Sequence, residues 1–230
     1  MTDEKLILAK KYYYLGRLFS MGAKKIDQDI EAAIEYFEKS RDLGYADATF
    51  QLGLIYYEGW RHQKPNYDKA FECFLLSGTD NGEFWVGRCY QQGRGVTQSY
   101  EKAIAIYEKL VKRGYTNAMM SLGHIYRGGS GVEKNQELAA KLYLMAAEGG
   151  NDAGYLHIAI SYKHGFGIEK NHEKADYWFK KWKKNGRKES DLCLYHEKEP
   201  DEYREAMDFF RAMADQGDIE CLRIIRAERD

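Results

Sequence analysis

The sequence predicts an all-α protein of the α-solenoid class, built from stacked helix–turn–helix units. Three observations predict it. Landmark residues recur every 36 positions, as Gly95, Gly131 and Gly167 do, and a fixed period of this size indicates stacked supersecondary units. Apolar residues between these landmarks follow the spacing of one helix face. The chain has 2 prolines against 22 glycines, which suits helices joined by tight glycine turns.

The charge balance excludes a general attraction to polyanions. The chain has 35 basic and 36 acidic residues among its 230 residues, a formal net charge of −1. Neither nucleic acid nor an anionic membrane is therefore an expected partner. The longest apolar run near the start, residues 6–9, is too short for a secretory signal. No stretch approaches the roughly 18 apolar residues of a membrane span.

Cysteine spacing indicates reduced thiols. The four cysteines are Cys73, Cys89, Cys193 and Cys221. They form no C-x-x-C pair, and their irregular steps do not suggest a disulfide framework. We therefore expect a cytoplasmic protein without a metal or another cofactor.

The second helix of each unit is predicted from an alanine that lies 11 residues before a glycine. The pairs are Ala33 and Gly44, Ala103 and Gly114, Ala139 and Gly150, and Ala175 and Gly186. Apolar residues follow each alanine at positions i+3, i+4 and mostly i+7, which form one helical face. The closing glycine suits a left-handed C-terminal cap.

The first helix of each unit is predicted from a Leu-Gly pair with an aromatic residue three positions later. Leu122–Gly123 with Tyr126 shows the pattern, and Ile158–Ala159 with Tyr162 is a variant. A small residue stands five positions before the glycine, such as Ala118. Small residues here would let a neighbouring helix approach closely.

These motifs resemble the Sel-1-like repeat family, a relative of the tetratricopeptide repeats. The stretch "AMMSLGHIYRGGSGVEKNQELAAKLYLMAAEGG", from Ala118, carries the family pattern with one extra residue before Gly131. The resemblance implies a right-handed superhelix of about five to six repeats in a single domain over 1–230. The repeats are expected near 5–44, 45–81, 82–114, 115–150 and 151–186, followed by a degenerate repeat and a C-terminal capping helix in 187–230.

Two repeats depart from the pattern. The second has Trp60 and Pro65 in place of its glycine turn, but its second helix is still predicted from Tyr67 to about Ser77. The sixth lacks the first-helix motif, yet a second helix is expected from the following apolar residues and closing glycine: Ala206, Phe209, Phe210, Met213 and Gly217.

The glycine loops admit two interpretations. The loop "GSGVEKN" could bind an anion at a helix N-terminus, or its glycines could supply positive φ angles for a tight turn. The loop recurs as "GRGVTQS" and "GFGIEKN" with different neighbours, which favours the structural interpretation. Val132 is then expected to pack in the core, and Asn135 to start the second helix.

Candidate catalytic and metal-binding residues are sparse. Six histidines occur, at positions 62, 124, 157, 164, 172 and 196, without an H-E-x-x-H pair. His157 and His164 could share a helix face, but no further ligand completes a metal set. No G-x-S-x-G or local cysteine signature marks a nucleophile. The sequence therefore predicts no catalytic residues.

One local basic run offers a second candidate surface. Six of the ten residues in "FKKWKKNGRK", 179–188, are Lys or Arg. They could form a patch for an anionic partner. However, Trp178, Phe179 and Trp182 occupy the packing face, which would leave the lysines on an ordinary solvated side.

The more promising surface is the concave groove that, by the resemblance, first helices line in such solenoids. Three columns of residues outside the motif are expected there. The binding candidates from these columns are Tyr14, Arg17, Gln51, Tyr57, Trp85, Arg88, Gln91, His124, Arg127, His157 and Lys163. Aromatic and arginine residues are the types that anchor protein interfaces.

The sequence therefore predicts a non-enzymatic adaptor or scaffold that binds a protein or peptide in its groove. Basic and aromatic candidates favour a ligand with acidic and apolar side chains, and a bacterial-type regulatory or signalling role is expected. The alternative is an immunity protein that neutralises a toxin or enzyme by direct docking. An enzyme would need a set of catalytic groups that the sequence does not display.

Overall fold

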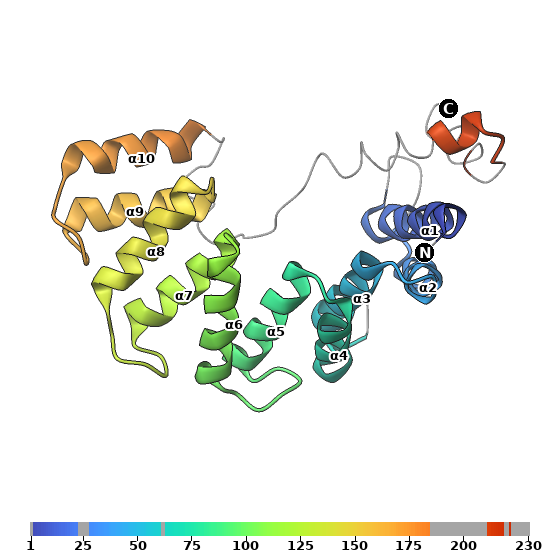
Figure 1. The fold of residues 1–230 in the computed structure, drawn as a ribbon, viewed down its shortest axis with the longest axis horizontal. Helices are drawn as coiled ribbons and strands as arrows, with labels where there is room; N and C mark the ends of the chain where they lie inside the picture. The colour runs from blue at the N-terminus through green and yellow to red at the C-terminus, as the bar shows by residue number, and fades with distance from the viewer. Residues whose placement is uncertain (1, 23–27, 61–62, 185–210, 219–220, 222–230) are drawn as a thin grey trace. The chain divides into compact units, whose positions relative to one another are not determined.

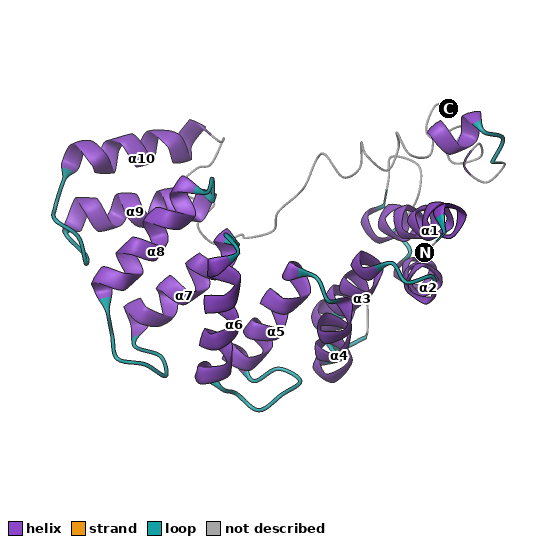
Figure 2. Ribbon diagram, in the orientation of Figure 1, coloured by secondary structure: helices purple, strands orange, loops and turns teal. Residues whose placement is uncertain are grey.

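The computed structural model describes residues 2–22, 28–60, 63–184, 211–218 and 221, which form helices joined by loops (Figure 1, Figure 2). The helices are α1 (Asp3–Met21), α2 (Ile30–Asp42), α3 (Ala46–Glu58), α4 (Tyr67–Ser77), α5 (Asp80–Gln92), α6 (Tyr100–Lys112), α7 (Thr116–Gly128), α8 (Gln136–Glu148), α9 (Asp152–His164) and α10 (His172–Lys184). The predicted all-α solenoid class is confirmed, as is the predicted helix from Tyr67 to Ser77.

The helices belong to two compact units. Unit 1 comprises Met1–Gly82 with His196–Asp230, and unit 2 comprises Glu83–Tyr195. In unit 1, α1 packs on α2 and α3 packs on α4. In unit 2, α7 packs on α8 and α9 packs on α10. Neighbours in sequence are thus partners in space, as the helix–turn–helix prediction requires.

Each second helix starts at a capping residue that also closes the loop. The Asn135 side chain accepts a hydrogen bond from the Leu138 N–H at 2.9 Å, and its own backbone N–H donates to the Tyr126 carbonyl at 2.8 Å. The same two bonds recur 36 residues later, at Asn171. The side-chain bond satisfies a donor that the helix leaves unpaired. Asn135 therefore starts α8, as predicted.

The glycine loop before α8 has a structural role. Gly131 has a φ of 72°, a conformation that glycine adopts without a steric cost. A Cβ atom at this position would also overlap the side chain of Tyr100, at the start of α6. Val132 packs partly buried against the core of unit 2. Glycine is therefore required here by backbone conformation and by space.

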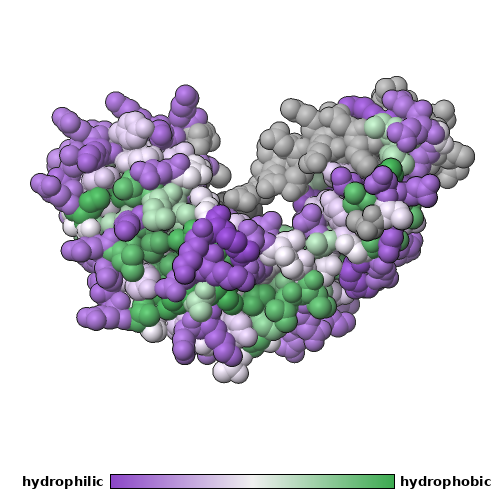
Figure 3. All heavy atoms as spheres, in the orientation of Figure 1, coloured by the Kyte–Doolittle hydropathy of each residue, from purple (hydrophilic) through white to green (hydrophobic). Residues whose placement is uncertain are grey.

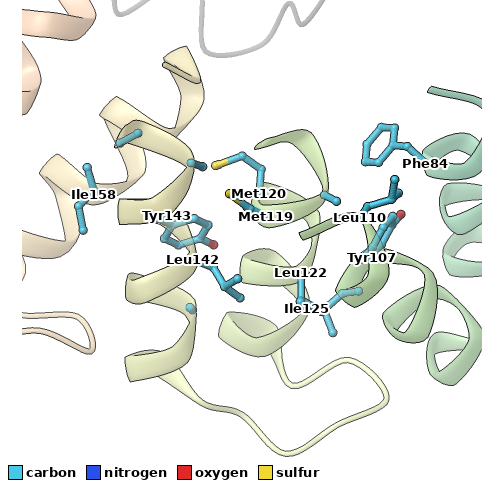
Figure 4. Close-up of a cluster of buried hydrophobic side chains, with 14 of the residues drawn as sticks. Phe84, Tyr107, Leu110, Met119, Met120, Leu122, Ile125, Leu142, Tyr143 and Ile158 are labelled. Carbon is cyan, nitrogen blue, oxygen red and sulfur yellow. The ribbon is translucent and has the colours of Figure 1, made fainter. Parts of the chain in front are cut away.

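The glycine of the Leu-Gly motif makes room for an aromatic ring. A Cβ atom on Gly123 would lie 2.6 Å from Cε1 of Tyr143, which is closer than two carbon atoms that are not bonded to each other approach. Figure 4 shows the Tyr143 ring extending from α8 toward α7, among Leu122, Leu142 and other buried residues of unit 2. The predicted close approach of the two helices at this small residue is confirmed.

The described part of the sixth repeat ends as the other second helices do. The Gly217 N–H donates to the Ala214 carbonyl, and the Asp218 N–H donates to the Met213 carbonyl. The same pair of bonds closes α8 at residues 150 and 151. The predicted cap at Gly217 is confirmed. The other predicted helix positions, 206, 209 and 210, lie outside the described residues, as does the expected closing helix over 219–230 apart from Cys221.

This C-terminal segment contacts the first helix. Lys11 Nζ lies 2.8 Å from Asp218 Oδ2, and the two side chains are 12% and 20% exposed. Burial alone would raise the pKa of Asp218, but the hydrogen bonds from Lys11 and from the Cys221 N–H hold it below its usual value. The sequence predicted only that the segment closes the chain, so its pairing with α1 is a finding of the structure.

Candidate functional site

Three predicted binding residues lie together on α5 in unit 2. The Arg88 guanidinium carbon lies 4.3 Å from the centroid of the Trp85 ring, a cation–π arrangement. One turn further, the Gln91 side-chain carbonyl accepts a hydrogen bond of 2.9 Å from the Tyr107 hydroxyl on α6. Trp85 and Arg88 therefore offer an aromatic and a cationic group, while the Gln91 oxygen is already engaged.

Two further candidates, His124 on α7 and His157 on α9, come together. Their Nε2 atoms are 3.3 Å apart, so one ring donates to the other there. The His157 ring stacks on Tyr143 with centroids 4.9 Å apart, and the His124 ring lies 5.5 Å from the same tyrosine. The three rings thus form one cluster over α7, α8 and α9, which we call the His–Tyr cluster.

The environment of the His–Tyr cluster keeps both histidines neutral at pH 7. Loss of water around the rings, aided by the positive charge of Arg127, lowers the pKa of His124 and of His157 from 6.5 to about 4. His124 remains an exposed residue as a whole, but its ring faces His157 and Tyr143. The cluster therefore presents uncharged donors and acceptors.

A pocket adjoins the cluster. It has a volume of about 150 Å³ and is lined by Arg127, Gln136, Ala139, Ala140, Tyr143, His157, Ile160, Ser161 and Phe166. Arg127, another predicted binding residue, carries the one formal charge among these residues at pH 7. Figure 3 shows hydrophobic residues, in green, gathered over the region of α8 and flanked by hydrophilic ones. The pocket therefore combines apolar walls with a single cationic group.

The hydroxyl group of Tyr143 is the unusual atom of this site. Tyr143 is 2% exposed, and its hydroxyl has no hydrogen-bond partner. Burial raises the pKa of Tyr143 to about 12, although Arg127 opposes the shift, so the hydroxyl keeps its proton. Buried polar groups normally have a hydrogen-bond partner. In the preceding repeat, the equivalent tyrosine, Tyr107, donates its hydroxyl proton to Gln91. The two repeats therefore differ in whether this hydroxyl has a partner.

The candidates in unit 1 are more deeply packed. Tyr57 is 6% exposed and packs against Tyr67 and Phe74. Tyr14 is 9% exposed, while Gln51 and Arg17 are half-buried. The two tyrosines thus fill space between helices and leave little surface for a partner, and the binding role of all four stays a prediction.

The last binding candidate is a surface lysine. Lys163 is exposed on α9. His164 stacks on Phe166 with ring centroids 5.3 Å apart, so it does not join His157 as its spacing suggested. His157 instead meets His124, which lies 33 positions earlier. This offset of 33 positions equals one 36-residue repeat less about one helical turn, and the printed sequence already displays this spacing.

The basic run is solvated where the structure describes it. Lys180, Lys181, Lys183 and Lys184 are exposed, while Trp178 and Trp182 are buried. This confirms the predicted division of α10 into a packing face and a lysine face. Residues 185–188 of the run lie outside the described residues.

Three features bear on metal binding, catalysis and membrane insertion. Within the described ranges, no three His, Cys, Asp or Glu side chains gather as a metal site. Cys89 is fully buried, and its burial raises the pKa of the thiol to about 11, so it is a poor nucleophile. In the same part of the chain, no helix is long and apolar enough to cross a membrane.

Several solved structures of bacterial proteins have similar folds. A Sel1 repeat protein from Oxalobacter formigenes is 26% identical with a TM-score of 0.68, over 91% of this chain and 87% of that one. A protective antigen of uropathogenic Escherichia coli with an SLR fold is 28% identical with a TM-score of 0.67, over 93% of this chain and 47% of that one. The present chain thus spans about half the length of that antigen.

An immunity protein from Pseudomonas aeruginosa, Pa5087, has the same fold at lower similarity. It is 16% identical with a TM-score of 0.57, over 84% of this chain and 75% of that one. At this identity, the likeness concerns the fold alone. Comparison with curated proteins found no match.

A family model of the Sel1 repeat matches most of the sequence. The matched segments are residues 12–45, 46–79, 80–115, 116–151, 153–186 and 192–218. Sel1 repeats generally serve as scaffolds for protein interactions and are typically non-enzymatic. With six matched repeats and the same helix pairs in its structure, the chain belongs to the Sel1 repeat family.

Proposed function

We propose that unit 2 binds an acidic and apolar segment of a partner protein on the surface formed by α5, α7 and α9. The observation that carries this proposal is the charge distribution of these three helices. Their acidic residues are confined to the first turns, at Asp80, Glu83 and Asp152. Glu83 is neutralised by ion pairs with Lys109 and Arg113. The rest of the three helices carries only basic and neutral side chains.

This basic surface stands out in a chain that is otherwise balanced. The whole chain has 35 basic and 36 acidic residues, and the second helices α6, α8 and α10 carry acidic residues beyond their first turns. In the described residues, neither Arg88 nor Arg127 forms an ion pair with a carboxylate. Two arginines near aromatic rings suit recognition of carboxylates and apolar groups. A regulatory or signalling role through such an interaction is the function that we propose.

The test is charge reversal on the proposed surface. Partners are captured with the wild-type protein, identified, and titrated as purified proteins against the Arg88→Glu, Arg127→Glu double variant. We expect the affinity to fall at least about tenfold, because each reversal replaces an attraction with a repulsion. The matched control is Lys112→Glu with Lys141→Glu, which makes the same charge change at exposed positions of α6 and α8. Equal affinity of wild type and the arginine variant would refute the proposal.

The alternative function, inhibition of a toxin or enzyme, remains a separate hypothesis. The similar immunity protein supports it only through the shared fold. Stoichiometric loss of the activity of a captured partner on addition of the purified protein would favour this alternative over a passive adaptor.

A further inference from the structure

We infer that the pocket between α7, α8 and α9 binds one carboxylate group of the partner, with Arg127 and the Tyr143 hydroxyl as its donors. The carboxylate belongs either to an acidic side chain or to a chain terminus. This inference rests on the proposed function and names the group that the surface recognises.

The first argument compares two consecutive repeats. In the earlier repeat, the Tyr107 hydroxyl donates to Gln91 at 2.9 Å. Thirty-six residues later, Tyr143 replaces Tyr107 and Arg127 replaces Gln91. A guanidinium group has only donors, so it offers a hydroxyl proton no acceptor. The Tyr143 hydroxyl is correspondingly buried and unpartnered. The site therefore lacks an acceptor. Because the hydroxyl is closed to solvent in the free protein, the bound acceptor reaches it through a small movement of the pocket wall that Tyr143 forms.

The second argument is the electrostatics of the pocket. Arg127 is its one charged residue, and no Asp or Glu lines it. The two neighbouring histidines are neutral at pH 7. One positive charge beside one unpaired hydroxyl matches a group with a single negative charge and two acceptor oxygens. A carboxylate has these properties, and it can take one hydrogen bond from the guanidinium and one from the hydroxyl.

The third argument is size. Small-molecule sites have volumes of roughly 300–1,000 Å³, whereas this pocket has about 150 Å³. It is therefore too small for a cofactor or drug-sized ligand, but it can admit one carboxylate with its adjacent carbon atoms. Ala139, Ala140 and Ile160 form apolar walls, and an apolar surround strengthens a charge-assisted hydrogen bond.

The inference is tested by NMR titration of the full chain with three small probes. N-acetylglutamic acid α-amide presents a side-chain carboxylate, N-acetylglutamine presents a terminal carboxylate, and N-acetylglutamine amide is neutral. We expect one or both carboxylates to give saturable shifts at His157, Ser161 and Arg127, with none from the neutral probe. The probe with the lower dissociation constant shows whether the partner's carboxylate belongs to a side chain or to a chain terminus.

The decisive variants are Tyr143→Phe and its counterpart Tyr107→Phe. Tyr143→Phe retains the ring and should weaken carboxylate binding about tenfold, because it removes one hydrogen bond to a charged group. Tyr107→Phe, whose hydroxyl is engaged within the protein, should leave binding within about twofold of wild type. Absence of saturable shifts, equal shifts from the neutral probe, or unchanged binding by Tyr143→Phe would each overturn the inference.

The same variants separate this inference from the proposed function. If Tyr143→Phe binds the identified partner as wild type does while the Arg88→Glu, Arg127→Glu variant does not, the carboxylate pocket is wrong and the basic surface stands. If Tyr143→Phe weakens binding of the partner while the Arg88→Glu single variant does not, the pocket stands and the wider surface is wrong.

Discussion

The two equivalent tyrosines should respond in opposite ways to loss of the hydroxyl group. Tyr143→Phe removes a buried hydroxyl without a hydrogen-bond partner. Such a group costs about 1–3 kcal/mol of folding free energy. The ring that packs on Gly123 keeps its volume, so no cavity forms. We therefore expect this substitution to stabilise the protein by about 1 kcal/mol, taking the lower end of that range.

Tyr107→Phe removes a satisfied hydroxyl instead. The hydrogen bond of 2.9 Å to Gln91 is lost, and a typical bond of this kind contributes about 1 kcal/mol. Gln91 is half-buried, so water can reach its side-chain oxygen and limit the loss. We expect destabilisation by about 1 kcal/mol, so the two substitutions should differ by about 2 kcal/mol.

The assay combines thermal unfolding with native-state hydrogen exchange. A change of 1 kcal/mol shifts the midpoint by about 2–4 °C in a chain of this size. Because repeat proteins unfold through neighbouring units, exchange rates in α7 and α8 against those in α5 and α6 report the local free energy directly. Destabilisation by Tyr143→Phe, or equal effects of both substitutions, would refute the reasoning.

Three further predictions concern unit 2. Gly123→Ala should destabilise it by about 1–3 kcal/mol, since the added Cβ would lie 2.6 Å from Tyr143; an unchanged melting temperature would contradict this packing. The free energy of unfolding should fall as the pH drops from about 6.5 toward 4. Over this range both histidines take up protons in the unfolded chain, whereas in the folded chain His124 and His157, with pKa values of about 4, stay neutral. Denaturant titrations across that range should show a flatter pH profile for the His124→Phe, His157→Phe double variant than for the wild type, and an identical profile would count against the cluster. Cys89 should react with thiol reagents only upon unfolding, given its burial and its pKa of about 11; rapid labelling of the folded chain would show otherwise.

The fold was predictable because its determinants are local and repeated. The position of Asn135 at the start of α8, the turn at Gly131 and the bounds of α4 all follow from short patterns that recur along the chain. Each recurrence is an independent observation of the same geometry. A single copy of "GSGVEKN" could have been taken for an anion-binding loop, and its copies decide against that interpretation.

The candidate site was predictable only in part. The sequence placed His124, Arg127 and His157 among the binding residues, because motif spacing identifies the positions outside the core. It did not predict that His124 and His157 share a hydrogen bond, which depends on how two repeats are offset in space. Tyr143 was expected only on the packing face of its helix. Its hydroxyl has no hydrogen-bond acceptor nearby, and only the three-dimensional structure shows that no acceptor is within reach.

The exchange of Gln91 for Arg127 between two otherwise equivalent positions suggests how such a chain can acquire new specificity. A glutamine codon becomes an arginine codon by a single nucleotide change, and the packing of the tyrosine ring on its glycine is untouched. One such change removes the acceptor of an internal hydrogen bond and leaves a tyrosine hydroxyl without a partner, on a residue that lines a pocket. Because the repeats share the same helix packing, a side chain outside the packing positions can change in one repeat and alter what that repeat binds, while the solenoid stays intact.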